Sequence, residues 1–314
     1  MVVTGAGGFV GQEACTRLLL AGRSVRALAR RNFTLPDGQT SRLTITVVED
    51  LATAEHPEDL LAGADAVVHL AARAHRTTDK PDITASLYDR DVQMTKALAL
   101  AAHRAGVRRM VYLSSVKALG DRSPHGALAR TSPPNPVDPY GRSKLAAERQ
   151  LAAISAATGL QVVVIRPPLV YGPAASANFR QLVRWVRREI PLPLAGVRNR
   201  RSIVSVDNLA SFIVRCLGPI DEPFNIFHVS DPGPVSTPEL LRYVAAGLGV
   251  RPRLFSVPTG LLQRLCALTG RADLAARLLG SLELETQDSF AALAWQPRTA
   301  TREGILRAVR GMQF

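Results

Sequence analysis

The sequence predicts an α/β protein, with a doubly wound parallel sheet and a smaller, mostly helical C-terminal lobe. Three observations support this. Short apolar strand patterns alternate with helical patterns from residue 1 to about residue 170. A glycine-rich turn, "TGAGGFVG", joins the first strand to the first helix. From Ser236 onward the pattern becomes helical. Strands that alternate with helices form parallel sheets covered on both faces.

The N-terminal elements follow one another in a regular order. Residues 1–4 form an apolar run, and apolar positions recur at helical spacing from Val10 to Leu20, where Ala21 and Gly22 end the helix. Further strands are expected at 24–30, 43–51, 64–72, 108–116 and 161–172, and helices at 57–63, 91–106 and 138–159.

The alternation weakens after Val170. Helices are expected at 179–188 and 204–217, and a strand at 224–230. A helix at 236–249 opens with a Ser/Thr cap, followed by Pro238 and Glu239. We therefore predict two domains. The main domain comprises residues 1–170 and about 200–230, and the lobe comprises about 171–199 and 231–314.

Composition limits the classes of function. The net charge is +13, but only four of the 39 basic residues are Lys and aromatic residues make up 5%. So few aromatics argue against a nucleic-acid partner, and anionic small ligands or an acidic membrane surface explain the charge equally well. No apolar run is long enough to span a membrane, and no signal peptide is apparent. The three cysteines are far apart and the six histidines show no ligand spacing, which predicts a cytoplasmic protein without a metal.

The glycine turn predicts a dinucleotide site and hence a Rossmann-type sheet. Gly5, Gly8 and Gly11 follow a strand directly and open a helix, and Phe9 and Val10 lie within the same turn. Without side chains the backbone can approach a pyrophosphate, to which the helix N-terminus offers free N–H groups. The alternative is a glycine turn that serves only tight packing.

Three other segments are candidates for cofactor binding. Where a dinucleotide fold often has an acid at the end of the second strand, this chain has Arg30 and Arg31. Because Arg pairs well with a 2′-phosphate, NADP(H) is favoured, with NAD(H) and a solvated basic turn as alternatives. Asp50 and Leu51 are candidates for lining the adenine. The fourth strand ends in His69, which we expect to be a packed residue, followed by small candidate cofactor residues: Leu70, Ala71 and Ala72.

The stretch "DPYGRSK" carries the candidate catalytic pair. Asp138 caps a predicted helix, and Tyr140 and Lys144 lie one turn apart on one of its faces. A nearby ammonium group favours the phenolate, so Tyr140 can act as an acid or a base, and Lys144 can also hold the cofactor. Ser114 and Ser115, at the end of the fifth strand, supply a hydroxyl for the reacting oxygen.

Together these pieces resemble the extended short-chain dehydrogenase/reductase superfamily, in its NAD(P)-dependent nucleotide-sugar epimerase/dehydratase branch. The matching pieces are "TGAGGFVG", "HLAA", "YLSSVKALG", "YGRSK", "RPPLVYGP" and "RRSIVSVDNLA". The family's serine lies 25 residues before its tyrosine, and 140 − 25 = 115 selects Ser115 and leaves Ser114 a structural role. The resemblance also implies that Pro167 contacts the cofactor.

The resemblance further implies a nucleotide-sugar substrate, UDP-linked. By likeness to family segments, Asn178 and either Arg200 or Arg201 are candidates for the diphosphate, and Ser115 for the sugar. The alternative for the arginines is a solvated position beside a strand. Val116 and Lys117 stand where the family's dehydratases carry an Asp-Glu pair, which argues against 4,6-dehydration. Asp91 stands where an Asn is common.

We therefore predict an oxidoreductase that acts at C4 of a nucleotide sugar in bacterial surface-polysaccharide synthesis. Reduction of a UDP-6-deoxy-N-acetylhexosulose ranks first, because the arginine pair favours NADP(H). UDP-glucose or UDP-N-acetylglucosamine 4-epimerisation ranks second, and a non-catalytic nucleotide-binding subunit is the alternative of another class. The family implies a homodimer that uses the helices at 94–106 and 138–159. The basic, amphipathic segment 260–280 fits either a core helix of the lobe or a membrane-surface helix.

Overall fold

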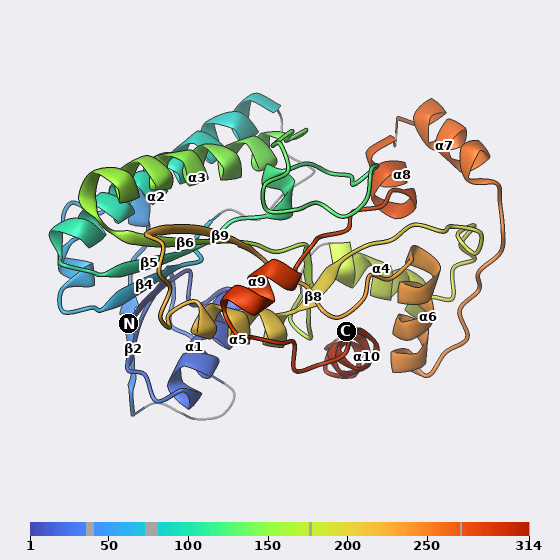
Figure 1. The fold of residues 1–314 in the computed structure, drawn as a ribbon. Coiled ribbons are helices and arrows are strands. Elements are labelled where there is room, and N and C mark those ends of the chain that lie inside the picture. The colour runs from blue at the N-terminus through green and yellow to red at the C-terminus, as the bar shows by residue number, and fades with distance from the viewer. Residues whose placement is uncertain (36–40, 73–80, 176–177, 271, 314) are drawn as a thin grey trace.

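The computed structural model of the chain describes residues 1–35, 41–72, 81–175, 178–270 and 272–313. Its centre is a seven-stranded parallel sheet in the order β3-β2-β1-β4-β5-β6-β9, which confirms the predicted fold class (Figure 1). The strands are β1 (Val2–Thr4), β2 (Val25–Ala29), β3 (Leu43–Val47), β4 (Ala66–His69), β5 (Arg109–Leu113), β6 (Gln161–Arg166) and β9 (Phe224–His228).

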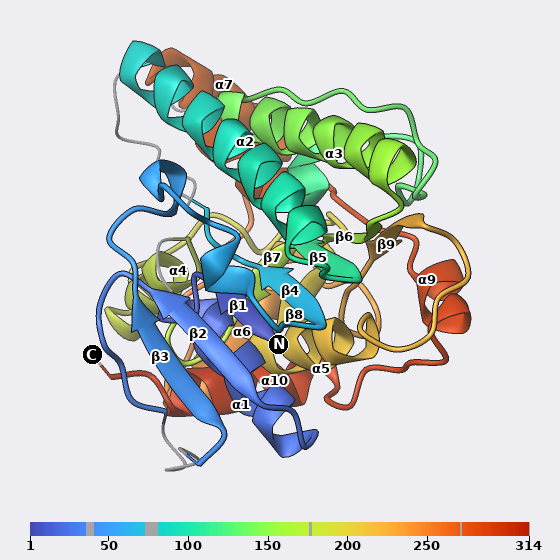
Figure 2. The same ribbon diagram turned by 90° about the vertical axis from the view of Figure 1, so that its left-hand side faces the viewer.

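Helices cover both faces of this sheet (Figures 1 and 2). On one face lie α2 (Pro81–Arg104) and α3 (Pro139–Thr158), and on the other lie α1 (Phe9–Leu20) and α5 (Val206–Arg215). Each layer has its own apolar core, so the central strands are buried on both sides. The surface of α2 and α3 is where the family resemblance predicts a homodimer interface, and this stays a prediction.

Several expected elements differ from those observed. The helix expected at 204–217 begins only at Val206, because Val204 and Ser205 belong to a strand. The helix expected from residue 91 begins ten residues earlier, at Pro81, and the helix expected at 57–63 is only the short 3₁₀ turn η2 (Asp59–Leu61). The strand expected at 161–172 divides at Pro167 and Pro168, which have no N–H group for a strand ladder. Its second half, β7 (Leu169–Tyr171), pairs with β8 (Ile203–Ser205) in a separate two-stranded sheet.

The C-terminal region packs around a third core. Its helices are α4 (Asn178–Arg187), α6 (Thr237–Leu248), α7 (Thr259–Leu268), α8 (Ala272–Leu279) and α10 (Thr301–Arg310). As predicted, Ser236 caps α6, and Glu239 completes a capping box. The short helix α9 (Gln287–Ala292) instead precedes Trp295, which packs edge-to-face on Phe212 of α5 at 4.9 Å between ring centroids. The predicted domain boundaries stay a prediction.

Candidate active site

The glycine turn lies between β1 and α1, where a side chain would not fit. A Cβ atom on Gly5, whose φ is +67°, would lie 2.7 Å from the Ala71 nitrogen, and one on Gly11 would lie 2.2 Å from the Gly5 oxygen. Gly8 precedes the first residue of α1, and no side chain caps that helix. The free N–H groups of α1 and the bare backbone therefore fit a pyrophosphate. Ala71, another predicted cofactor residue, lies against this turn because its N–H donates to the Thr4 hydroxyl at 3.2 Å.

The start of α3 is held against the end of β5 by a contact that only glycine permits. A Cβ on Gly141 would lie 2.3 Å from the Lys117 carbonyl oxygen, in the 3₁₀ turn η3 (Val116–Ala118) that follows Ser115. Asp138 caps α3 by accepting from the Gly141 N–H at 2.7 Å, and its carboxylate also pairs with the Lys117 ammonium. This packing brings Ser115 beside Tyr140.

Tyr140 is partly buried among candidate catalytic groups. A side-chain hydrogen bond joins it to Ser115, and its ring meets Tyr88 of α2 edge-on, at 5.7 Å between centroids. Burial raises the pKa of Tyr140 above its usual value, and the bond to Ser115 opposes that increase. At neutral pH the phenol therefore carries its proton and can donate it to an oxygen placed beside Ser115.

Lys144 is almost fully buried behind Tyr140. Its Nζ donates to the Leu113 carbonyl at 3.0 Å and to the Tyr112 hydroxyl at 3.2 Å, and it lies 5.8 Å from the centre of the Tyr140 ring. Burial lowers the pKa of Lys144 to about 8, while the carboxylates of Asp91 and Glu148 oppose that decrease. A pKa of about 8 leaves most Lys144 side chains charged at neutral pH.

Ser114 has a different environment from its neighbour Ser115. Its hydroxyl donates to Glu148, which also receives two hydrogen bonds from Arg166, at 3.0 and 2.6 Å. All three side chains are buried. Ser114 thus belongs to an internal polar network, as expected for a structural residue.

His69 is packed inside the protein, as predicted. Its ring nitrogens lie 2.7 and 3.1 Å from the Thr4 and Thr95 hydroxyls, and burial lowers its pKa to about 3.

The residues predicted to bind the adenosine part of the cofactor are exposed or partly exposed to solvent. Arg30 and Arg31 are exposed directly after β2, and no ion pair or hydrogen bond within the described chain involves them. Asp50 caps the 3₁₀ turn η1 (Leu51–Thr53) by accepting from the Ala52 N–H at 2.9 Å, and it also pairs with Arg90. The exposed arginines are therefore available for an anionic ligand.

The two candidate diphosphate arginines differ in environment. Arg200 is largely exposed and forms a two-pronged ion pair with Glu283, at 2.7 and 2.8 Å. Arg201 is half-buried and donates to the Gly280 carbonyl at 2.8 Å. The Asp121 carboxylate, whose charge acts on Arg201, also lies 3.5 Å from Lys117. Arg201 is therefore within electrostatic range of Asp121, which contacts the Lys117 ammonium near the start of α3. Asn178 begins α4, and its side chain lies outside the described residues.

Sequence reasoning missed two features of this site. The first is Gly141, which lies in the segment "YGRSK" but was not predicted to have a role. A glycine in the first turn of a helix was the signal that could have indicated a close contact there. The buried Glu148–Arg166 pair had no signal, because partners 18 residues apart on a helix and a strand show no local spacing.

Two kinds of feature are absent from the residues that the structure describes. No helix among them is both long and apolar enough to cross a membrane. No cluster of three His, Cys, Asp or Glu side chains in the same part of the chain could hold a metal ion.

The sequence of the chain is similar to those of known enzymes. The model of the "NAD dependent epimerase/dehydratase family" matches residues 1–228. The chain is 35% identical to a UDP-glucose 4-epimerase of Vibrio cholerae, over 97% of this chain and 93% of that protein. It is 29% identical to an N-acetyl-alpha-D-glucosaminyl-diphospho-ditrans,octacis-undecaprenol 4-epimerase of Escherichia coli O157:H7, over 85% of this chain and 78% of that protein.

Solved structures show the same architecture. MoeE5 in complex with UDP-glucuronic acid and NAD superposes with a TM-score of 0.78 at 27% identity, covering 99% of this chain and 97% of that one. The family match, the close relative and the Rossmann-type sheet agree with the predicted superfamily. The chain therefore belongs to the NAD-dependent epimerase/dehydratase family of the extended short-chain dehydrogenase/reductases and is an NAD-dependent enzyme.

Proposed function

We propose that the enzyme catalyses oxidation and reduction at C4 of a UDP-linked sugar, with 4-epimerisation as the net reaction. The observation that carries the proposal is the cluster of Tyr140, Ser115 and Lys144, at the end of β5 and the start of α3. The similarity to the Vibrio cholerae epimerase over nearly the whole chain supports the choice of reaction.

In this mechanism, side chains of the protein transfer a proton to and from the C4 oxygen. Bound nicotinamide supplies hydride transfer to and from the sugar. Tyr140 accepts the hydroxyl proton as C4 is oxidised and returns it as C4 is reduced, while Ser115 hydrogen-bonds the same oxygen. Oxidation therefore starts from the phenolate of Tyr140, which the positive charge of Lys144 stabilises; Tyr140 holds the proton between the two steps, and reduction regenerates the phenolate. Arg201 is the better placed candidate for the diphosphate, because Glu283 already neutralises Arg200.

A second candidate, reduction of a 4-keto sugar, is favoured by one observation. Arg30 and Arg31 stand exposed after β2, where they suit the 2′-phosphate of an exchangeable NADPH. Dehydration has less support. DesIV, a dTDP-glucose 4,6-dehydratase, is 26% identical with a TM-score of 0.78, but here Lys117 stands in the segment of the dehydratases' acidic pair and its ammonium is bound to Asp138.

One experiment separates the two candidates. Purified enzyme is given UDP-glucose or UDP-N-acetylglucosamine with no added cofactor, and the C4 epimer is followed by NMR. An epimerase returns the hydride it takes, so we expect conversion over many turnovers with cofactor that remains bound. If no epimer forms and a 4-keto sugar is instead reduced in step with NADPH consumption, the reductase assignment replaces ours.

Cofactor preference provides a separate prediction. The second candidate requires that Arg30 and Arg31 recognise the 2′-phosphate of NADP(H). Replacing them (Arg30→Asp with Arg31→Ala) should then weaken NADPH binding by about 1.5–3 kcal/mol and leave NADH binding nearly unchanged. Isothermal titration with each cofactor measures both effects. Arg23→Asp, an exposed change at the opposite end of β2, is the control. Equal affinities of the double variant and the control for NADPH would show that the pair faces only solvent.

A further inference from the structure

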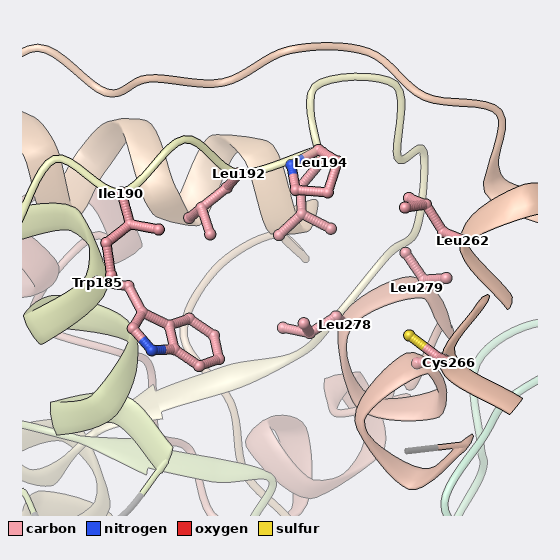
Figure 3. A pocket seen from close by; sticks show the side chains of 10 residues that line it. Trp185, Ile190, Leu192, Leu194, Leu262, Cys266, Leu278 and Leu279 are labelled. Atoms are coloured by element: carbon pink, nitrogen blue, oxygen red, sulfur yellow. The ribbon is translucent and has the colours of Figure 1, made fainter. Parts of the chain in front are cut away.

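The C-terminal lobe contains an apolar cavity that the proposed C4 chemistry does not use (Figure 3). Its volume is about 210 Å³, and it lies between the end of α4, the segment 190–194, α7 and α8. The lining consists of aliphatic and aromatic side chains with one thiol, that of Cys266; among them are Trp185, Leu192, Leu262, Leu278 and Leu279.

The chemistry of this lining selects the kind of ligand. A nucleoside would bury base and ribose polar groups here without partners, which is costly. Apolar cavities of about 150 Å³ stay dry and bind hydrocarbons such as benzene. A cavity of about 210 Å³ therefore has room for a short stretch of hydrocarbon chain.

The outer face of α7 continues the apolar surface beyond the cavity. Leu262 and Cys266 line the cavity, whereas Leu261, Leu265 and Leu268 are exposed by 49%, 50% and 84%. Their spacing places the three leucines on one side of the helix. Such a row of exposed leucines marks an interaction site for lipid or protein, and it suits a hydrocarbon chain longer than the cavity.

The wall of the cavity is next in sequence to a residue that binds Arg201, the candidate for holding the diphosphate. Leu278 and Leu279 line the cavity, and the next residue, Gly280, accepts the hydrogen bond of Arg201 at 2.8 Å. The Asn199 side chain fixes this stretch by donating to the Leu278 and Gly280 carbonyls, at 3.1 and 3.0 Å. One ligand can therefore place phosphate at Arg201 and hydrocarbon in the cavity.

We propose that this lobe binds a sugar linked through a diphosphate to an isoprenoid chain, the kind of substrate named for the Escherichia coli relative, with the start of the chain in the cavity and its continuation along the exposed leucines of α7. The inference rests on the proposed reaction at C4 and names a second substrate class for the same site. It assigns the segment 260–280 to lipid binding, beyond its role as a structural part of the lobe.

Binding can be measured without turnover. The probe is farnesyl diphosphate, and the first readout is the emission of Trp185, identified by its loss in Trp185→Phe. The second readout is alkylation of Cys266, because Cys15 and Cys216 are buried. We expect farnesyl diphosphate to shift the emission and slow the alkylation, and UDP or inorganic diphosphate to do neither. Anionic phospholipid vesicles that protect Cys266 as well as the probe does would overturn the proposal in favour of simple membrane docking.

A cavity-filling variant tests the location. Ala275→Phe places a ring in the cavity and should weaken farnesyl diphosphate binding by about tenfold or more, as overpacking displaces the chain. With farnesyl-diphospho-N-acetylglucosamine as substrate, KM should rise by a similar factor and kcat should stay unchanged. NAD binding and thermal melting verify that the variant is folded, and Leu20→Ser, an exposed leucine of α1, is the control.

The two proposals fail in different ways. Unchanged probe affinity in Ala275→Phe, or no response of either readout in the wild-type enzyme, would sink the lipid proposal whatever the enzyme does with UDP sugars. Loss of the C4 assignment would appear as unaltered turnover in Tyr140→Phe and would leave both binding readouts untouched.

Discussion

Tyr140→Phe is expected to reduce kcat by about 10²–10⁴-fold, the usual contribution of a positioned general acid or base. The ring remains in place against Tyr88, and only the phenol oxygen bonded to Ser115 is lost. The variant should therefore fold normally and keep its affinity for the cofactor. Steady-state kinetics of C4 epimer formation and titration with NAD measure the two effects.

Tyr243→Phe is the matched control, since Tyr243 packs in the core of the C-terminal lobe and lies outside the candidate site. It should retain full turnover. A Tyr140→Phe enzyme that keeps more than about a tenth of wild-type kcat, against the range expected of a general acid, would remove Tyr140 from the proton-transfer role.

Arg166→Met should cause the largest loss of stability. Arg166 and Glu148 are each 3% exposed and are joined by two hydrogen bonds of 3.0 and 2.6 Å. Methionine fills much of the space of the arginine side chain but leaves the Glu148 carboxylate buried without its charged partner. Breaking one side of such a pair costs about 3–5 kcal/mol of unfolding free energy, which urea denaturation would measure.

Two comparisons check that reasoning. The double variant Glu148→Leu with Arg166→Met removes both charges and should recover much of the lost stability, because replacing a whole buried pair by apolar groups is often close to neutral. Arg307→Met breaks an ion pair with Glu303 in which both side chains are more than 60% exposed, and it should change stability by less than about 1 kcal/mol. A loss of that small size in Arg166→Met would show that the buried carboxylate finds another partner.

Local signals in the sequence were enough to predict much of the fold and the core of the candidate site. The Rossmann-type sheet followed from alternating strand and helix patterns and from the glycine turn, and the observed strand order confirms it. Asp138, Pro139 and the spacing of Tyr140 and Lys144 predicted a capped helix with both side chains one turn apart, and α3 has that cap. Capping and helical periodicity act over a few residues, so they can be read from the chain itself.

Contacts between distant segments were decided only by tertiary packing. Ser114 and Ser115 are adjacent and identical in type, yet Ser114 turns to Glu148 and Ser115 to Tyr140 because α3 packs on η3 through Gly141. In the sequence, Arg200 and Arg201 were equivalent candidates for the diphosphate. In the structure, Glu283, 83 residues after Arg200, forms an ion pair with Arg200 and so distinguishes the two. The cavity beside α7 likewise joins segments from α4 to α8. Each of these outcomes depends on which side chains meet across the fold, and local propensity carries no information about partners so far apart in the sequence.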